Sequence, residues 1–409
     1  YLRLLDERKL RAMIILVVNT GSSSLKYQLI NMDNQEVMAK GLCERIGVDG
    51  HMSYKANGTT VFDKDVDLPN HGAALQMVID ALTDKETGVV SDMDDITAVG
   101  HRVVQGGKYG ASTLIDDEVI KAIEDYSVLA PLHNPPALVG IRACMEVLPK
   151  TPSVAVFDTS FHQTMPEESY LYAIPMEYYE KYSIRKYGYH GTSHRYVTEK
   201  CIEKLGKAPE DCNIITCHLG NGSSITAVKN GKCYDTSMGL TPLDGLVMGT
   251  RCGTLDPSVV SFITEQAGMT VQEVINMMNK ESGLLAVSGL SSDVRDVCTA
   301  SDNGDPRAMV AREMLLKSVR HYIGAYAAEM GEVDAIVFTA GIGENDMDLR
   351  EKVCGKLGFM GVKIDAEVNN VRGQDVEIST ADSAVRVFVI PTNEELMIAK
   401  DTQAIVEAL

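Results

Sequence analysis

Three stretches of the chain place glycine, serine and asparagine directly after an apolar run, and these residue types can bind phosphate. The stretches are residues 19–24, 218–224 and 339–345. Glycine lets backbone N–H groups approach an anion closely, while serine and asparagine add side-chain donors. One such turn is weak support for a ligand site, but three in one chain favour a nucleotide phosphate site. The P-loop signature is absent, because no second glycine precedes Lys26.

Two arginines lie among glycines, where the backbone is tight and a ligand can come close. Arg102 lies in GHRVVQGG, residues 100–107, and Arg251 lies in GTRCG, residues 249–253. A guanidinium group binds carboxylate and phosphate oxygens through paired N–H donors. We interpret both arginines as a clamp for anionic substrates, with a structural ion pair as the alternative for either one.

Histidines in turns form a third group with chemical potential. His190 and His194 have the i, i+4 spacing of a zinc-binding helix, but HGTSH lacks the glutamate of H-E-x-x-H. Thr192 and Ser193 are typical helix caps, which would leave His190 in the loop before the helix. We therefore expect His190 to donate to a phosphoryl group. A satisfied core histidine remains the alternative for His194 and for His218.

Two carboxylates lie where strands are predicted to end. Asp158 follows the apolar run Val154–Phe157, and Glu394 comes shortly after Ile390. Ligands of α/β sheets bind at the carboxyl ends of strands, and a carboxylate there can hold Mg²⁺, usually through water. Either residue could instead be a helix cap.

The elements that position these residues can be predicted from apolar periodicity. Residues 14–29 indicate strand, turn and strand, and residues 214–228 repeat that pattern about 200 residues later. This repeat favours two similar domains, with a chance echo as the alternative. Further along, a capping box begins at Thr270, and Asp305-Pro306 begins a helix that ends near Gly331. Strands are expected at 334–338 and 385–390, followed by a last helix that opens with Glu394 and Glu395. The alternation of strands and helices predicts the α/β class.

Composition bounds the possible functions. With 409 residues and 45% apolar residues, the chain is expected to form two domains of roughly 150 to 200 residues each. The net charge of -19 disfavours nucleic acid and anionic membranes as partners, so anionic substrates would need a locally basic cleft. Nine scattered cysteines without a C-x-x-C pair are typical of a reducing cytoplasm, and no apolar run approaches the ~20 residues of a membrane span. Residues 1–12 are interpreted as an extension or a cloning remnant.

These segments together resemble the acetate kinase (acetokinase) family from Met13 to the C-terminus. The motifs that carry the resemblance, in chain order, are VVNTGSSSLKY, GHRVVQGG, APLHNPP, VFDTSFHQTMP, RKYGYHGTSH, CHLGNGSS, MGTRCGTLDP, TAGIGEN and IPTNEEL. The resemblance implies two duplicated ribonuclease-H-like domains of the sugar kinase/Hsp70/actin superfamily with an interdomain cleft. It further implies a first domain of residues 13–159 plus 395–409, a second, nucleotide-binding domain of residues 160–394, and a homodimer.

The resemblance also implies roles for individual residues. The phosphate side of the first domain would comprise Asn19, Ser22, Ser24 and Lys26. Contacts to the transferring phosphoryl group would come from Arg102, Arg251, His190 and Asn221. The nucleotide phosphates would lie along His218, Gly220 and Gly222, and the nucleoside between Asp293, Arg295, Gly341, Ile342 and Asn345. Magnesium would lie near Asp158, Glu394 and Asn19. The small apolar pocket for the acyl methyl group would comprise Val104, Leu132, Tyr189 and Pro242.

The activity that the resemblance implies is reversible transfer of the ATP γ-phosphoryl group to acetate, with Mg²⁺ (or Mn²⁺ in its place), in the cytoplasm and on the path to acetyl-CoA. A propionate or butyrate kinase is the nearest alternative, and a sugar or glycerol kinase is a remote one. An Hsp70-like binding protein would need a peptide-binding domain, for which no residues remain. Three departures from common family residues stand near the predicted site: Gln105 for histidine, Val294 for an aromatic residue, and Tyr189 for phenylalanine. Gln105 could change affinity modestly, Val294 weakens the case for ATP preference, and Tyr189 adds a hydroxyl to the pocket wall.

Overall fold

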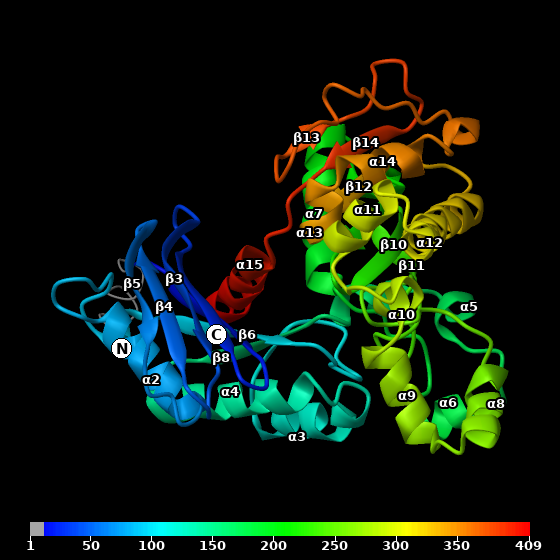
Figure 1. Ribbon diagram of the computed structural model, residues 1–409. Helices are drawn as coiled ribbons and strands as arrows, with labels where there is room; N and C mark the ends of the chain where they lie inside the picture. The colour runs from blue at the N-terminus through cyan, green and yellow to red at the C-terminus, as the bar shows by residue number, and fades with distance from the viewer. Residues whose placement is uncertain (1–11) are drawn as a thin grey trace. The chain divides into compact units, whose positions relative to one another are not determined.

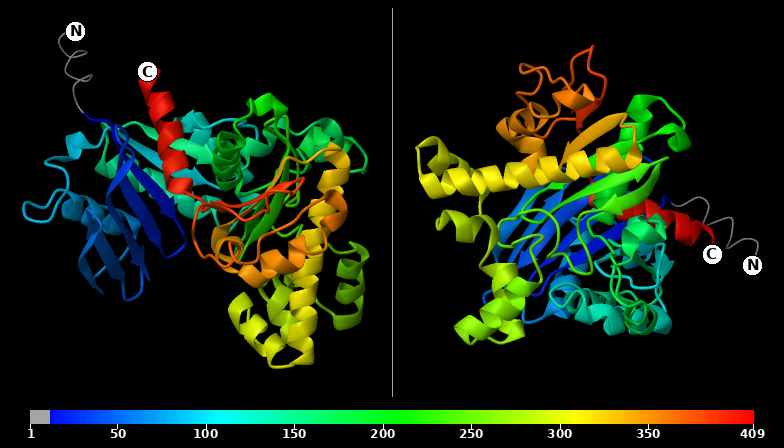
Figure 2. Two further views of the ribbon diagram at one scale, coloured as in Figure 1. Left: turned by 90° about the horizontal axis from the view of Figure 1, so that it is seen from above. Right: turned by 90° about the vertical axis from the view of Figure 1, so that its right-hand side faces the viewer.

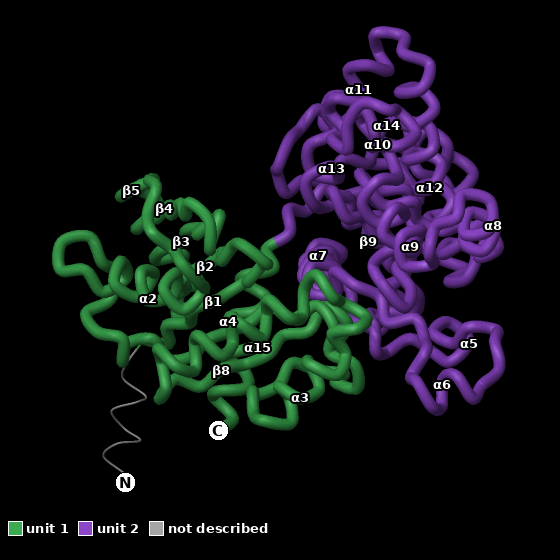
Figure 3. Tube along the Cα trace, turned by 60° about the horizontal axis from the view of Figure 1, so that its bottom comes forward, with its two compact units in different colours: residues 1–160, 393–409 green, residues 161–392 purple. Residues whose placement is uncertain are grey.

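A computed structural model describes residues 12–409 and divides them into two compact units (Figure 3). Unit 1 comprises residues up to Ser160 together with Asn393–Leu409, and unit 2 comprises Phe161–Thr392. The sequence predicts boundaries after residues 159 and 394. Most of the segment interpreted as an extension, residues 1–11, lies outside the described residues.

Unit 1 is built on an eight-stranded mixed sheet of order β5-β4-β3-β2-β1-β6-β8-β7. Five strands form an antiparallel meander, and β6 and β8 then run parallel to β1, with β7 antiparallel to β8. The strands are β1 (Ile14–Thr20), β2 (Leu25–Asn31), β3 (Glu36–Glu44), β4 (His51–Ala56), β5 (Thr59–Asp65), β6 (Ala98–Val103), β7 (Thr113–Leu114) and β8 (Ser153–Phe157).

Helices cover both faces of this sheet, as Figure 1 shows. Alternate residues of β1 face opposite sides, so Leu16 packs with one buried cluster and Val17 with another. The first cluster includes α2 (His71–Leu82) and α4 (Asn134–Val147), and the second includes α15 (Glu394–Glu407). A strand buried on both faces reads as a continuous apolar run, which explains Ile14–Val18. Helix α3 (Asp117–Asp125) packs beside α4.

Unit 2 repeats this plan with a six-stranded sheet of order β11-β10-β9-β12-β14-β13. The strands are β9 (Ile214–Leu219), β10 (Ser223–Lys229), β11 (Lys232–Thr236), β12 (Ala335–Thr339), β13 (Val376–Glu377) and β14 (Arg386–Val389). Again a three-strand meander is followed by two parallel strands, so β11-β10-β9-β12-β14 corresponds to β3-β2-β1-β6-β8. The predicted α/β class with a repeated domain plan is confirmed.

Two helices cover opposite faces of the second sheet. Helix α7 (Gly191–Leu205) packs with Val337 and Phe388, and the long helix α12 (Pro306–Met330) packs with Ile336 and Phe338. Figure 2 shows α12 running across the strands of this unit. The other helices are α5 (Glu167–Tyr170), α6 (Glu177–Tyr182), α8 (Ser258–Ala267), α9 (Val271–Lys280), α10 (Gly283–Ser288), α11 (Val294–Asp302), α13 (Ala340–Asn345) and α14 (Met347–Cys354). Short 3-10 turns lie at Met93–Asp95, Tyr126–Val128, Ser160–Thr164, Pro209–Asp211 and Gly358–Met360.

Most local predictions are confirmed. Both hairpins form, with Asn19 opposite Lys26 in the first and Leu219 opposite Ser223 in the second. Thr270 closes its capping box with Glu273, and Asp305 caps α12. None of the helices within residues 12–409 combines the length and the hydropathy that a membrane crossing requires.

Two local predictions were wrong. Residues 339–345 are not an open turn, because helix α13 starts directly at Ala340, where the Glu344 carboxylate accepts the Ala340 N–H at 2.8 Å. Thr192 and Ser193 do not cap α7, since both lie inside its first turn and His190 occupies the N-cap position with a left-handed φ of 56°. Helix α7 therefore begins at Gly191, earlier than Thr192 and Ser193 suggested, after two residues with positive φ, Gly188 (φ +73°) and His190.

Candidate active site

A cavity of about 830 Å³ in unit 2 brings together residues that the sequence assigned to a nucleotide. The predicted residues reach it from three places: the β9–β10 turn, the start of α11, and α13 after β12. The predicted residues on its wall are Gly220, Asn221, Asp293, Arg295, Gly341, Ile342 and Asn345. Loops after parallel strands meet at one edge of a sheet, which is why segments more than a hundred residues apart share this cavity.

The cavity wall also contains residues that the sequence analysis missed. Arg312 comes from α12 and Arg372 from the loop before β13. Arg372 precedes Gly373, which has φ +58°, so the arginine-beside-glycine signal was present but not used. Arg312 binds Asp302 and Asp348, a pairing across three helices that periodicity cannot reveal. Val294, the departure from an aromatic residue, lies on the wall.

Asp293 and Arg295 form a closed pair at the start of α11. Asp293 caps the helix by accepting the Arg295 N–H at 2.8 Å, and the Arg295 Nε lies 3.0 Å from the same carboxylate oxygen. Arg295 lowers the pKa of Asp293 through these hydrogen bonds. The pair therefore places two opposite charges at the rim of the cavity.

Gly222 and Gly249 let polar side chains come close to the β9–β10 turn. A Cβ on Gly249 would lie 2.2 Å from the Asn221 Oδ1, so only glycine permits that side chain its position. A Cβ on Gly222 would lie 3.4 Å from His190 Nε2 and 3.5 Å from Arg251 Nη1. His190 and Arg251 thus face the same small space over the β9–β10 turn.

Arg251 is held by backbone rather than by a carboxylate. Its Nη1 donates to the Pro242 carbonyl at 2.9 Å, and it has no ion pair within the described part of the chain. Burial lowers the pKa of Arg251. A partly buried cation without a counter-charge favours an anionic ligand.

The histidines of unit 2 form a buried polar network behind this point. His190 Nδ1 lies 2.9 Å from Ser224 Oγ, and His194 Nε2 lies 2.7 Å from the same oxygen. The rings of His190 and His218 stack with centroids 4.2 Å apart. Burial lowers the pKa of His194 well below its usual range. His194 is therefore the satisfied core histidine, while His190 and His218 stand nearer the cavity turn.

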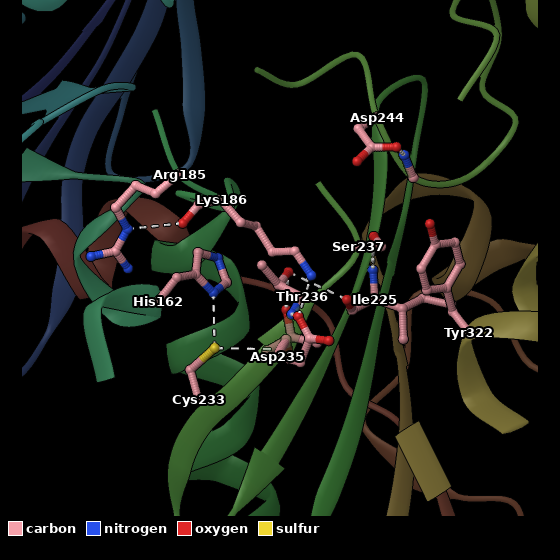
Figure 4. Close-up of polar contacts among 12 residues, drawn as sticks. His162, Arg185, Lys186, Ile225, Cys233, Asp235, Thr236, Ser237, Asp244 and Tyr322 are labelled. Carbon is pink, nitrogen blue, oxygen red and sulfur yellow. Dashed lines mark hydrogen bonds and ion pairs between the residues drawn. The ribbon is translucent and has the colours of Figure 1, made fainter. Parts of the chain in front are cut away.

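A neighbouring cluster supports the chain segment that carries His190. Figure 4 shows His162 between Arg185 and Cys233, with the Lys186–Asp235 pair beside it. The second ring nitrogen of His162 lies 2.9 Å from the Tyr189 carbonyl oxygen, which anchors the residue before His190. Burial raises the pKa of Asp235 despite the lysine.

In unit 1 the predicted residues form a charged cluster. Arg102 binds Asp158 through Nη2 at 2.7 Å and Nε at 3.3 Å, and its Nε lies 3.8 Å from Glu394. Burial opposes the charge, but Asp158 and then Glu394 raise the pKa of Arg102. Lys26 pairs with Glu395, and Asn19 lies opposite Lys26 on β1. The structural ion pair that the sequence left as an alternative is therefore present for Arg102.

The same cluster has the chemistry of a site for a hard cation. Burial raises the pKa of Glu394, and the nearby Asp158 adds to the rise. Among the described residues, ion pairs join the three carboxylates Asp158, Glu394 and Glu395 to the two cations Arg102 and Lys26. Mg²⁺ prefers oxygen ligands and retains waters, so the donor set fits it. Within residues 12–409, however, no group of three metal-binding side chains is close enough to form a complete cage.

The remaining predicted residues differ in exposure. Ser22 is exposed in the turn that Gly21 closes by donating to the Ser24 carbonyl at 2.8 Å. Val104 is buried and Leu132 is exposed, both in unit 1. Tyr189 and Pro242 belong to unit 2, where the Tyr189 hydroxyl donates to the Leu240 carbonyl at 2.6 Å.

The other departure, Gln105, is fully buried and accepts the Gly107 N–H at 2.8 Å. Its side chain shapes the glycine turn after Arg102.

Comparison with known proteins agrees with the resemblance. The sequence profile described as the acetokinase family matches residues 14–400. Acetate kinase of Halothermothrix orenii is 57% identical over 401 residues, which cover 97% of this chain and 100% of the relative. Acetate kinase of Methanosarcina thermophila is 55% identical over 397 residues, covering 97% of each chain.

Solved structures show the same fold. The crystal structure of Porphyromonas gingivalis acetate kinase matches with a TM-score of 0.91 at 45% identity, covering 97% of this chain and 100% of the other. A propionate kinase from Francisella tularensis matches with a TM-score of 0.89 at 43% identity, covering 96% and 99%. From its sequence, fold and cavity residues, this chain belongs to the acetokinase family.

Proposed function

We propose that this protein transfers the γ-phosphoryl group of ATP to acetate, reversibly, giving acetyl phosphate and ADP. The observation that carries the proposal is the meeting of His190 and Arg251 over Gly222, beside a cavity lined by the predicted nucleotide residues. A donor and an unpaired cation at the phosphate end of a nucleotide cavity suit phosphoryl transfer.

The acceptor chemistry explains why the proposed site needs no general base. A carboxylic acid has a pKa of roughly 4 and is already ionised at neutral pH, unlike the alcohol of a sugar. The remaining task is to bring two anions together and to stabilise charge on the transferring group. Arg251, His190 and Asn221 would do this from unit 2, and the family resemblance assigns Arg102 to the same clamp. Direct in-line attack by the carboxylate is the simplest route.

Mg²⁺ is part of the proposal, held near Asp158 and Glu394, with Asn19 near the carboxyl end of β1. When bound, it would neutralise charge on the nucleotide phosphates. In this proposal Asp158 orients the cation or its water and holds Arg102, and it removes no proton. Mn²⁺ could take the place of Mg²⁺ because both prefer oxygen ligands.

The proposal also specifies acetate as the preferred carboxylic acid acceptor. Val104, Leu132, Tyr189 and Pro242 are proposed to form the acyl pocket. A propionate kinase among the similar structures keeps propionate as the second candidate. One methylene changes binding by only ~1–3 kcal/mol, so overlap between the two acids is expected.

The test traps the acyl phosphate with hydroxylamine and compares acetate, propionate, butyrate and glycerol as acceptors with ATP and Mg²⁺. We expect the highest kcat/KM with acetate. Hydroxamate formation that is faster with propionate or butyrate would move the protein to the alternative. ADP release with glycerol but not with any acid would reject the proposal.

We further propose a homodimer in the cytoplasm, with domains 13–159 plus 395–409 and 160–394, that supplies acetyl phosphate toward acetyl-CoA. Nine free thiols and no disulfide suit a reducing compartment. Light scattering of the purified protein checks the dimer.

A further inference from the structure

Three hydrogen bonds connect Thr216 to His190 through the interior of unit 2. Thr216 Oγ1 lies 2.7 Å from His194 Nδ1, and His194 Nε2 lies 2.7 Å from Ser224 Oγ. The same Ser224 oxygen lies 2.9 Å from His190 Nδ1. Thr216, His194 and Ser224 have no exposed surface, so water cannot replace a missing partner. The geometry of this hydrogen-bonded series is set by two paired strands, because β9 carries Thr216 and β10 carries Ser224.

The protons in such a chain can point in only two directions. A neutral imidazole has one N–H, and a hydroxyl group has one proton to donate. His194 is neutral because burial disfavours its charged form. In the first direction Thr216 donates to His194, His194 donates to Ser224, and Ser224 donates to His190. In the second direction every bond is reversed.

The second direction leaves a buried donor without a partner. Among residues 12–409, the Thr216 hydroxyl has His194 Nδ1 as its sole hydrogen-bond partner. If His194 donated at that bond, the Thr216 proton would be buried and unpaired, at a cost of about 1–3 kcal/mol. In the first direction every proton in the chain has an acceptor. The first direction is therefore the stable one.

We propose that the buried chain Thr216–His194–Ser224 holds His190 as the neutral tautomer with its proton on Nε2. Thr216 and Ser224 are then positioning residues, because they act through His190. Nε2 is the nitrogen that faces Gly222 and Arg251, so the tautomer presents an N–H donor in that space. The value of this donor to the transferring phosphoryl group rests on the proposed function, whereas the tautomer itself does not.

The same count of donors and acceptors determines which ring nitrogen of His218 carries the proton. Its Nδ1 lies 2.7 Å from Ser193 Oγ, and Ser193 is fully buried in the first turn of α7. His218 is the sole partner of that hydroxyl among the described residues, so Ser193 donates and the His218 proton is on Nε2. Both rings of the stacked pair, His190 and His218, are therefore neutral, and each has its proton on Nε2.

The test is a two-bond ¹H–¹⁵N spectrum of the full chain with ¹⁵N-labelled histidine, without substrates, at about pH 8 where free histidine is neutral. His190→Asn identifies the His190 signals by their loss. We expect a protonated Nε2 and an unprotonated Nδ1 for His190. A protonated Nδ1 in the wild-type protein would overturn the proposal.

Thr216→Val tests whether the chain sets the tautomer from a distance. Valine has nearly the shape of threonine but no hydroxyl, so the penalty that separates the two directions disappears. We expect His190 to become a mixture of tautomers, although three hydrogen bonds separate Thr216 from it. A His190 spectrum identical to that of the wild type would reject the relay.

Ser224→Ala and Ser224→Thr provide the functional readout. Alanine removes the link, and we expect kcat to fall about tenfold or more with little change in KM, since a donor to the transition state loses its fixed position. Threonine retains the hydroxyl and should restore both kcat and the tautomer. Failure of threonine to restore the tautomer would count against the proposal.

The control is Ser237→Ala. Ser237 is also buried, and its Oγ accepts the Ile225 N–H at 2.9 Å (Figure 4). It follows β11, which pairs with the edge of β10 opposite β9. This variant should leave the His190 spectrum unchanged; a changed spectrum would mean that the signal reports general packing and would overturn the relay. The spectra need no substrate, so their outcome is independent of the hydroxylamine assay.

Discussion

The two arginines that the sequence grouped together have opposite surroundings in the two units. In unit 1, Arg102 binds the buried Asp158 through two nitrogens and lies near Glu394. In unit 2, Arg251 donates to the Pro242 carbonyl and has no carboxylate partner among the described residues. The charge of Arg102 is thus balanced within the protein, whereas that of Arg251 is available for an anion.

The same sequence signal, arginine beside glycine, can therefore lead either to an arginine paired with a carboxylate or to one without a counter-charge. A paired arginine contributes to folding and must share its donors with any ligand. An unpaired, partly buried arginine costs folding energy that a bound anion returns. Substitutions in the two units should therefore separate activity from stability.

The largest effect is expected for Arg251→Ala. Loss of the unpaired cation should remove at least about 3 kcal/mol of transition-state stabilisation, roughly a hundredfold or more in kcat/KM. The melting temperature should stay the same or rise, since no protein carboxylate loses its partner. Arg142→Ala, which removes a surface pair with Glu124, is the matched control and should keep full activity. Turnover close to that of the wild type would remove Arg251 from the clamp.

Arg102→Ala should instead destabilise unit 1. It leaves Asp158, 1% exposed, as a buried charge without its cation, and we expect a loss of about 3 kcal/mol in the free energy of unfolding. Asp158→Asn in the same background should recover part of this loss, because it removes the unpaired charge. Urea unfolding of Arg102→Ala, of the double variant and of Arg251→Ala measures the differences in the free energy of unfolding. Equal stability of Arg102→Ala and Arg251→Ala would contradict the contrast between the units.

Glu394→Gln should change how the melting temperature depends on pH. Because the pKa of Glu394 is raised in the folded protein, the unfolded chain releases this proton first as pH rises above the ordinary glutamate range. Folding stability from this group is therefore lost with rising pH until the folded group has also ionised. The glutamine variant lacks that loss, so its melting temperature should exceed that of the wild type at neutral pH and converge with it in acid. The same variant should need more Mg²⁺ for half-maximal activity, and an unchanged requirement would argue against a metal role.

The smallest effect is expected for Tyr189→Phe. The substitution removes the hydroxyl that donates to Leu240, worth about 1 kcal/mol, and the chain regains the residue common in the family. The loop that carries Pro242 should loosen, and the ratio of kcat/KM for acetate over propionate should fall by less than about tenfold. Tyr172→Phe is the matched control, since the Tyr172 hydroxyl accepts the Leu240 N–H at 2.8 Å. If the acetate-to-propionate ratio of kcat/KM changed in Tyr172→Phe but not in Tyr189→Phe, the Tyr189 hydroxyl would have no part in acid selectivity.

Much of the fold was predictable because its signals are local. The hairpin at 14–29, the capping box at Thr270 and the start of α12 at Asp305 each depend on residues within a few positions of one another. The run 339–345 was misjudged because its first turn is stabilised by Glu344, a carboxylate inside the helix rather than a cap before it. Likewise, the hydroxyls of Thr192 and Ser193 suggested caps, yet Ser193 bonds to His218, which lies 25 residues further along.

The sequence by itself determined which residue types stand after which strands, and so the chemistry and the family of this protein. Periodicity, caps and glycine turns act over a few residues, and they can be seen before folding. Only the tertiary structure decided which arginine is paired, which histidine is buried, and which way the protons of the Thr216–His190 chain point. Those properties arise from partners 56 residues apart for Arg102 and Asp158, and 34 apart for His190 and Ser224. Such contacts gain their energy from burial, and burial exists only once the two sheets and their helices have packed.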